Sequence, residues 1–161
     1  MKLYHGSLVI VDAPLILKPR RTLDYGKGFY TTTSRKQAED WVKRRLNSED
    51  KECGFVNVYE FDKELASTLN VLIFDSPTEA WVDFVMQNRT IKDFTHDYDI
   101  VYGPVANDRV YAAFALFEGG FLNKQELISE LKTYKLVDQY LFHTDRSLTT
   151  LSFIEAKEIR L

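Results

Sequence analysis

Few side chains of this 161-residue chain have the type and spacing of a familiar catalytic or metal-binding site. The three histidines, His5, His96 and His143, lie far apart, and no cysteine or paired-histidine spacing indicates zinc. The chain contains neither a phosphate-binding loop of the GxxxxGKS/T type nor a GxSxG nucleophile elbow. The glycines of residues 26–28 lack the third glycine of a dinucleotide fingerprint. These absences predict a site that uses no metal and none of these signatures.

Three short segments instead combine histidine, glycine, aromatic and amide side chains. They are LYHGS at residues 3–7, YGKGFYTT at residues 25–32 and VDQYLF at residues 137–142. Trp41 follows Tyr30 after eleven residues. Taken singly, each segment has a simpler explanation, because a lone histidine is more often structural and aromatic residues more often belong to the core. Their order along the chain is the more specific signal.

In this order the segments resemble the ADP-ribosyltransferase superfamily, in the branch that includes diphtheria toxin and the poly(ADP-ribose) polymerases. The resemblance implies a single α+β domain over residues 1–161, with an ADP-ribosyltransferase-like split β-sheet core and flanking helices. It also implies that NAD⁺ is the co-substrate and that no metal is needed.

The resemblance places the NAD⁺-binding residues in the first two segments and on the helix after them: His5, Gly6, Ser7, Gly28, Tyr30 and Trp41. His5 corresponds to the histidine that binds the NAD⁺ ribose, and the Gly6 backbone to the group that hydrogen-bonds the nicotinamide amide. Tyr30 and Trp41 correspond to the aromatic residues that sandwich the nicotinamide ring. These residue types suit the task, since flat rings stack on aromatic faces and glycine allows close backbone approach.

The expected catalytic residues are His5, Tyr30 and Gln139, and the last of these departs from the family pattern. The family has a glutamate at this position, whose charge stabilises the positive charge that develops on the ribose. Glutamine keeps the shape and one acceptor but loses the charge. A hydrogen bond to a charged group contributes about 1.5–3 kcal/mol, against about 0.5–1.5 kcal/mol for a neutral pair. We therefore expect a reaction slower by about one or two powers of ten.

Other charged residues near the segments could compensate for the missing carboxylate. Asp138 precedes Gln139 and should therefore point to the opposite face of the strand. Asp108 is an alternative carboxylate, although its position better suits a helix N-cap. Three basic residues could meet the NAD⁺ pyrophosphate or could simply be solvated: Arg20, Arg21 and Lys27.

A closer resemblance is to a poorly characterised bacterial group of this superfamily, which has segments of the LYHGS, DxGKGFYTT, YDIVxGPxAND and QYxFHT types. Genes of such groups often sit beside one for a small protein that resembles an antitoxin. The leading hypothesis is a mono-ADP-ribosyltransferase that modifies a macromolecule and acts as a toxin or effector of a toxin-antitoxin pair. The alternatives are a non-catalytic NAD⁺- or ADP-ribose-binding module and an interaction protein. Gln139 favours both alternatives.

The pattern of apolar residues predicts an α+β fold, because strands and helices are mixed without strict alternation. Strands are expected at residues 2–5, 15–17, 29–33, 55–61, 71–74, 99–103, 136–143 and 148–154. Helices are expected at residues 35–47, 77–88, 109–117 and 124–133. Ser34 and Gln37 should form a capping box, and Ser76 should cap the second helix ahead of Pro77.

The composition excludes several classes of protein. The 21 basic and 24 acidic residues give a net charge of −3, which argues against a generic phosphate-binding surface but does not exclude nucleic acid as the acceptor. Cys53 is the single cysteine, so no internal disulfide can form and a reducing compartment suits the chain. No apolar run approaches the ~20 residues of a membrane span. We expect a cytoplasmic protein that does not bind membranes.

Overall fold

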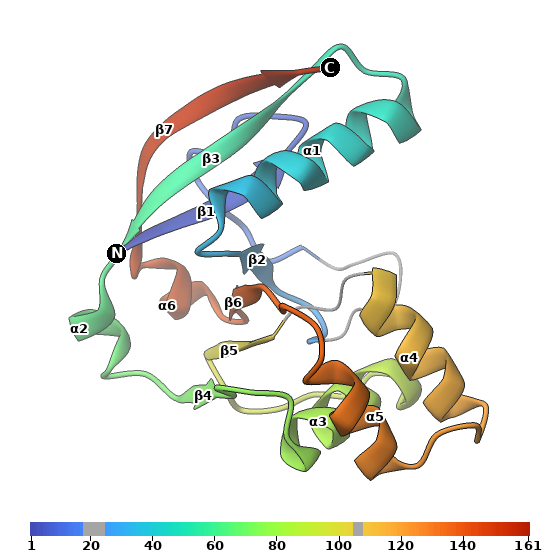
Figure 1. Ribbon diagram of the computed structural model, residues 1–161. Coiled ribbons are helices and arrows are strands. Elements are labelled where there is room, and N and C mark those ends of the chain that lie inside the picture. Colours follow the sequence, from blue (N-terminus) through green and yellow to red (C-terminus); the bar gives the residue numbers. More distant parts are fainter. Residues whose placement is uncertain (18–24, 105–107) are drawn as a thin grey trace.

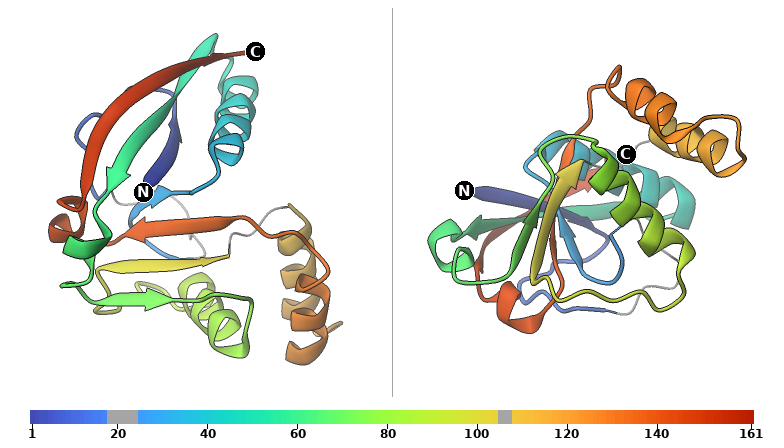
Figure 2. Two further views of the ribbon diagram at one scale, coloured as in Figure 1. Left: turned by 60° about the vertical axis from the view of Figure 1, so that its left-hand side comes forward. Right: turned by 90° about the horizontal axis from the view of Figure 1, so that it is seen from below.

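The computed structural model describes residues 1–17, 25–104 and 108–161, the side chains of 108 and 109 excepted (Figure 1). Within these residues, one sheet has the strand order β1-β3-β7 and the other the order β2-β6-β5-β4. The two sheets lie one above the other, and their strands run in different directions (Figure 2). The predicted α+β class is confirmed.

The three-stranded sheet is antiparallel and is covered on one face by α1 (Arg35–Glu49). Its strands are β1 (Lys2–Ser7), β3 (Cys53–Phe61) and β7 (Leu151–Arg160). The helix packs on this sheet through buried side chains at helical spacing: Ala38, Val42 and Leu46. This packing fixes α1 beside β1.

In the four-stranded sheet, one strand pair is parallel and the others are antiparallel. Its strands are β2 (Phe29–Thr31), β6 (Asp138–Phe142), β5 (Ile100–Pro104) and β4 (Val71–Ile73). Three helices cover one face: α3 (Glu79–Thr90), α4 (Asp108–Glu118) and α5 (Lys124–Leu131). An apolar cluster joins these helices to the sheet and includes Tyr25, Trp81, Phe114 and Leu141.

A second apolar cluster fills the space between the two sheets. Its buried members include Leu3, Phe29, Tyr59, Phe61, Ile100 and Phe142. The sheets are joined by an isolated bridge between Tyr4 and Thr32. The Tyr4 N–H donates to the Thr32 carbonyl at 2.8 Å, and the Thr32 N–H donates to the Tyr4 carbonyl at 3.0 Å. This bridge brings β1 and β2 side by side.

Ser34 caps α1 as predicted, but the capping box is only half formed. The Ser34 hydroxyl accepts from the Gln37 N–H at 3.2 Å. The Gln37 side-chain oxygen accepts from the Thr32 hydroxyl at 3.2 Å, and the Ser34 N–H donates to that same hydroxyl at 3.0 Å. Thr32 has therefore taken over the second half of the box.

The cap predicted for the second helix is wrong by two residues. Thr78 caps α3, and its hydroxyl accepts from the Trp81 N–H at 3.3 Å. The Thr78 N–H donates to the Ser76 carbonyl at 2.9 Å, so the chain makes a further turn before the helix begins. Serine and threonine are both good caps, and the sequence alone does not say which of the two is used.

The strand expected at residues 15–17 does not form. Leu15 and Leu17 are exposed, and Ile16 alone packs against the cluster between the sheets. No strand of the described chain pairs with this segment. Three apolar residues beside Pro14 therefore did not suffice to make a strand.

Two short helices escaped prediction because each is too short to show a helical period: α2 (Lys63–Ala66) and α6 (Asp145–Leu148). The second delays the start of β7 from the expected Leu148 to Leu151. None of the helices in the described residues is long and apolar enough to cross a bilayer.

Candidate functional site

The outer edge of β1 offers backbone hydrogen-bonding groups beside β2. Tyr4 turns its N–H and C=O toward Thr32, away from β3. Backbone groups of successive residues alternate between the two edges of a strand, so Gly6 directs its N–H and C=O to the same outer edge. The bridge at Tyr4 is isolated, and no ladder between described residues continues from it to Gly6. Gly6 can therefore offer one donor and one acceptor to a ligand.

His5 spans the gap between the two sheets. Its Nδ1 lies 2.7 Å from the Tyr30 carbonyl oxygen, which can only accept, so Nδ1 carries the proton. The ring packs on Phe29 with the ring centroids 4.4 Å apart. Burial lowers the pKa of His5 and outweighs the opposing effect of the bond to Tyr30. The neutral ring therefore presents Nε2 as an acceptor.

Tyr30 and Gln139 lie on the same face of the four-stranded sheet. Tyr30 pairs with Leu141, and Gln139 lies two residues before Leu141 on β6. Side chains two residues apart on a strand share a face, and such diagonal neighbours lie about 7–8 Å apart. The Tyr30 hydroxyl donates to the Gly26 carbonyl at 2.6 Å, which ties the ring to the preceding loop. Tyr30 is thus common to both contacts: its carbonyl oxygen meets the His5 ring, and its side chain shares a sheet face with Gln139.

Gln139 is an exception among the buried polar side chains of the described residues. The other seven form hydrogen bonds: Thr31, Thr32, Asn57, Asn88, Asp99, Ser147 and Thr150. Gln139 is only 7% exposed, yet its amide bonds to no described residue. Among the described residues, Nε2 of His143 is the one fully buried side-chain polar atom without a partner, so the Gln139 amide keeps some contact with solvent. The amide is therefore accessible to a ligand on this face of the sheet.

Trp41 lies on α1 beside the outer part of β1. A Cβ at Gly6 would lie 3.0 Å from the Trp41 ring and 2.7 Å from the Ala38 carbonyl oxygen, so this close packing requires glycine. The Arg45 guanidinium lies 5.1 Å from the centroid of the Trp41 ring. The two rings of the expected sandwich thus come from different layers, Trp41 from the helix on the three-stranded sheet and Tyr30 from the four-stranded sheet.

Ser7 and Gly28 shape the loops next to these residues. Ser7 ends β1, and its hydroxyl accepts from the Val9 N–H at 3.2 Å. A Cβ at Gly28 would lie 2.9 Å from the Phe142 carbonyl oxygen and 3.1 Å from Nδ1 of His143. Gly28 therefore lets the loop before β2 rest directly on the end of β6.

Asp138 lies on the sheet face opposite Gln139, as the strand period predicts. Its carboxylate accepts from the Thr33 N–H at 2.9 Å and from the Thr33 hydroxyl at 2.6 Å. The hydroxyls of Thr32 and Tyr102 add longer bonds at 3.2 and 3.3 Å. Asp138 thus fastens β6 to the turn between β2 and α1, on the face opposite Gln139.

Of the remaining charged candidates, Lys27 alone has a described side chain. Asp108 begins α4, and its side chain lies outside the described part of the chain. Arg20 and Arg21 also lie outside the described residues. Lys27 contacts the chain just after β6 through its backbone carbonyl oxygen, which lies 2.7 Å from Nδ1 of His143.

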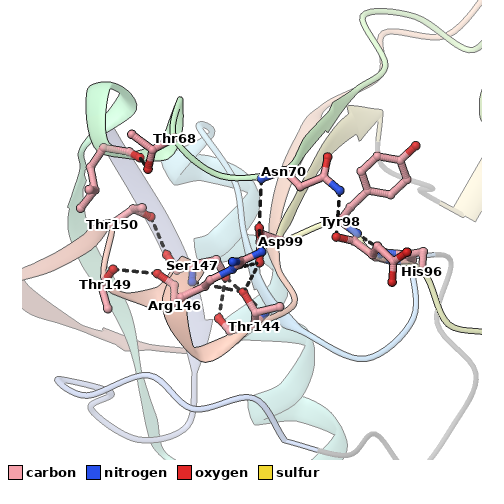
Figure 3. A network of polar contacts seen from close by, with 12 residues as sticks. Thr68, Asn70, His96, Tyr98, Asp99, Thr144, Arg146, Ser147, Thr149 and Thr150 are labelled. Carbon is pink, nitrogen blue, oxygen red and sulfur yellow. Dashed lines mark hydrogen bonds and ion pairs between the residues drawn. The ribbon is translucent and has the colours of Figure 1, made fainter.

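An ion pair between the buried Asp99 and the exposed Arg146 was not anticipated from the sequence (Figure 3). Asp99 accepts from Nε and Nη2 of Arg146 at 2.7 and 2.8 Å, from the Thr144 hydroxyl at 2.7 Å and from the Asn70 N–H at 3.0 Å. Burial alone would raise the pKa of Asp99, but these hydrogen bonds bring it down to about 2. The partners lie up to 47 residues away in sequence, so no local spacing could reveal the contact.

Two cavities formed by described residues lie away from His5, Tyr30, Trp41 and Gln139. One, of about 560 Å³, lies between the start of α1 and the loop before β6, and its lining includes Ser34, Tyr102 and Asp138. The other, of about 520 Å³, lies between α4 and α5. In the described part of the chain, no group of three or more histidine, cysteine or acidic side chains could hold a metal ion.

The comparisons with known proteins give one result. A family model described as "Protein of unknown function (DUF3990)" matches residues 1–153. The searches of curated proteins and of solved structures found no match. The family description gives no activity, so the function has to be argued from the site.

Proposed function

The chain belongs to the DUF3990 family, and we propose that it is a mono-ADP-ribosyltransferase that transfers ADP-ribose from NAD⁺ to a macromolecule. In this proposal the two sheets are the split core of the ADP-ribosyltransferase fold. The protein acts as a bacterial toxin or effector in the cytoplasm, and a small antitoxin protein is its partner. The observation that carries the proposal is the placement of Gln139 on the same sheet face as Tyr30, with an amide that bonds to no described residue.

His5 and Gly6 support the proposal through the groups they present. The neutral His5 ring has an acceptor nitrogen suited to a ribose hydroxyl, because its other nitrogen is held by Tyr30. The outer N–H and C=O of Gly6 match the acceptor and the donor of a carboxamide such as that of nicotinamide. The rings of Tyr30 and Trp41 would supply the flat surfaces between which nicotinamide stacks.

The proposed reaction exchanges one bond at the ribose for another. Nicotinamide leaves with the electron pair of its bond to the ribose carbon, which becomes positively charged in the transition state. A nucleophile of the acceptor then bonds to that carbon and loses a proton. The oxygen of Gln139 would accept from a ribose hydroxyl and orient the sugar, with less stabilisation of the charge than a carboxylate provides.

A second candidate function is a module that binds NAD⁺ or ADP-ribose without turning it over. The neutral side chain of Gln139 favours it, because the amide can hold the ribose while contributing little to charge stabilisation. The two functions use the same residues and differ in whether nicotinamide is released.

Transfer of label from NAD⁺ labelled in its adenylate part tests the proposal. We expect label to reach a macromolecule in a bacterial lysate and nicotinamide to be released in step. Tyr30→Ala should abolish both, whereas Tyr111→Ala, which removes an exposed tyrosine of α4, should abolish neither. Binding of NAD⁺ without release of nicotinamide would select the binding module. A folded protein that binds neither NAD⁺ nor ADP-ribose would refute both functions.

A further inference from the structure

His143 directly follows β6 and supports the loop that leads into β2. Its Nδ1 lies 2.7 Å from the Lys27 carbonyl oxygen, so Nδ1 carries the proton and donates it. A Cβ at Gly28 would lie 3.1 Å from the same nitrogen. The loop of residues 26–28 therefore rests on the imidazole ring, and a side chain at Gly28 would push it away.

The His143 ring is held by a rigid neighbourhood. The backbone N–H of His143 donates to the backbone carbonyl of Asp99 at 2.8 Å. The buried Asp99 carboxylate is in turn the centre of the ion-pair cluster. The ring stands perpendicular to that of His96 with the centroids 4.5 Å apart. His143 thus connects the ion-pair cluster to the loop of residues 26–28.

The same loop controls one end of the Tyr30 ring. The Tyr30 backbone is fixed by pairing with Leu141, and the adjacent pair joins Phe29 to Phe142. The Tyr30 hydroxyl, at the far end of the ring, donates to the Gly26 carbonyl at 2.6 Å. A displacement of the loop would move the hydroxyl end of the ring while its backbone end stays in the sheet.

We propose that His143 is a positioning residue, which sets the angle of the Tyr30 ring toward nicotinamide through the loop of residues 26–28. This inference rests on the proposed function, since it takes Tyr30 to stack on the nicotinamide ring. Only the nicotinamide part of the ligand should depend on the contact. ADP-ribose, which lacks nicotinamide, should bind without it.

The neutral form of His143 is the one that fits this role. Its Nε2 is buried and has no hydrogen-bond partner among the described residues, so a proton there would be unsatisfied. The pKa of His143 is lowered to about 4, mainly by burial and also by the adjacent His96, which together outweigh the opposing effects of Lys27 and Asp99. At neutral pH the ring therefore keeps the single proton that it donates to Lys27.

Calorimetry with NAD⁺ and with ADP-ribose separates positioning from general stability. Asparagine places an amide nitrogen close to the position of Nδ1, whereas glutamine places it one bond further along. His143→Gln should weaken NAD⁺ binding about tenfold and ADP-ribose binding by less than about twofold. His143→Asn should restore NAD⁺ binding to within about threefold of the unmodified protein. Gly28→Ala, whose added methyl group would push the loop away from the His143 ring, should reproduce the selective loss of NAD⁺ binding.

Two results would overturn the inference while leaving the proposed function intact. One is unchanged NAD⁺ binding in both His143→Gln and Gly28→Ala. The other is an equal loss of NAD⁺ and ADP-ribose binding, with no rescue by asparagine, which would make His143 merely structural. Failure of the unmodified protein to bind either ligand would refute the proposed function, and the inference with it.

Discussion

Asp99 and Gln139 are buried polar side chains at neighbouring strands of one sheet, yet their surroundings differ in every contact. Asp99 is fully buried and accepts hydrogen bonds from Arg146, Thr144 and Asn70 (Figure 3). Gln139 is 7% exposed and bonds to no described residue. The Gln139 amide still reaches solvent, since Nε2 of His143 is the one fully buried unpartnered side-chain atom of the described residues. Asp99 therefore contributes to the fold, whereas the proposed function assigns the Gln139 amide to a ligand.

Acid should lower the free energy of unfolding in two steps, first through the histidines and then through Asp99, and this is the largest effect that we expect. Burial lowers the pKa values of His5, His96 and His143, so the unfolded chain binds more protons than the folded one below the ordinary value of 6.5. The contribution of these neutral histidines to the free energy of unfolding is therefore complete above pH 6.5 and is lost as the pH falls. For His143, whose pKa falls to about 4, the loss reaches about 3 kcal/mol.

The contribution of Asp99 has a different pH window. Its pKa is lowered from 3.8 to about 2, so its stabilisation is intact above pH 3.8 and is lost only as the pH falls toward 2. Urea unfolding at a series of pH values should therefore show a first loss of stability well above pH 4. A free energy of unfolding that stays constant between pH 7 and about pH 4.5 would contradict the lowered pKa values of these histidines.

Gln139→Glu should introduce the charged side chain that the family resemblance implies at this position. We expect nicotinamide release to rise about ten- to hundredfold, or about 1.4–2.8 kcal/mol of transition-state stabilisation. The gain should increase with pH, since a buried carboxyl has a raised pKa and acts when ionised. Asp138→Glu serves as the control, because Asp138 faces the opposite side of the sheet. Slower release by Gln139→Glu than by the unmodified protein would count against the assigned role.

Asp99→Asn should weaken the fold and leave ligand recognition unchanged in kind. The substitution keeps the shape but removes the charge that Arg146 and Thr144 contact, so we expect a loss of about 2 kcal/mol. Asp97→Asn, at an exposed neighbouring position, should change stability by less than about 0.5 kcal/mol. Chemical denaturation measures both. Equal stability of the two variants would show that the ion-pair cluster is not a structural support.

Gln139→Met should have the smallest effect on stability. Methionine fills a similar volume and breaks no hydrogen bond to a described residue, so the free energy of unfolding should change by less than about 1 kcal/mol. Binding of NAD⁺ should nevertheless weaken. A clear loss of stability in this variant would mean that the amide serves the fold after all.

Local features of the fold could be predicted from the sequence, because local physics determines them. The cap at Ser34 and the opposite faces of Asp138 and Gln139 follow from hydrogen-bonding type and from the strand period. The choice of Thr78 over Ser76 did not follow, since both residues cap well and the turn between them decides. Short elements such as α6 are invisible to a periodic pattern.

Contacts across the chain were beyond sequence reasoning. Asp99 meets Arg146, and His143 meets the Lys27 carbonyl, only after the loops before β2 and β5 and the segment after β6 have come together. The sequence gives no periodic or spacing signal for such pairs. The sequence could mark Gln139 as the residue at the position of the family glutamate. That its amide bonds to no described residue is visible only in the structure.

The most direct test of whether Gln139 contacts the ligand is NMR of its side-chain amide. The signal is assigned by its disappearance in Gln139→Met. We predict that NAD⁺ shifts this signal strongly while the Nε signal of Arg146, paired with Asp99, stays in place. An unchanged Gln139 signal at saturating NAD⁺, in a sample that is otherwise folded, would contradict the account.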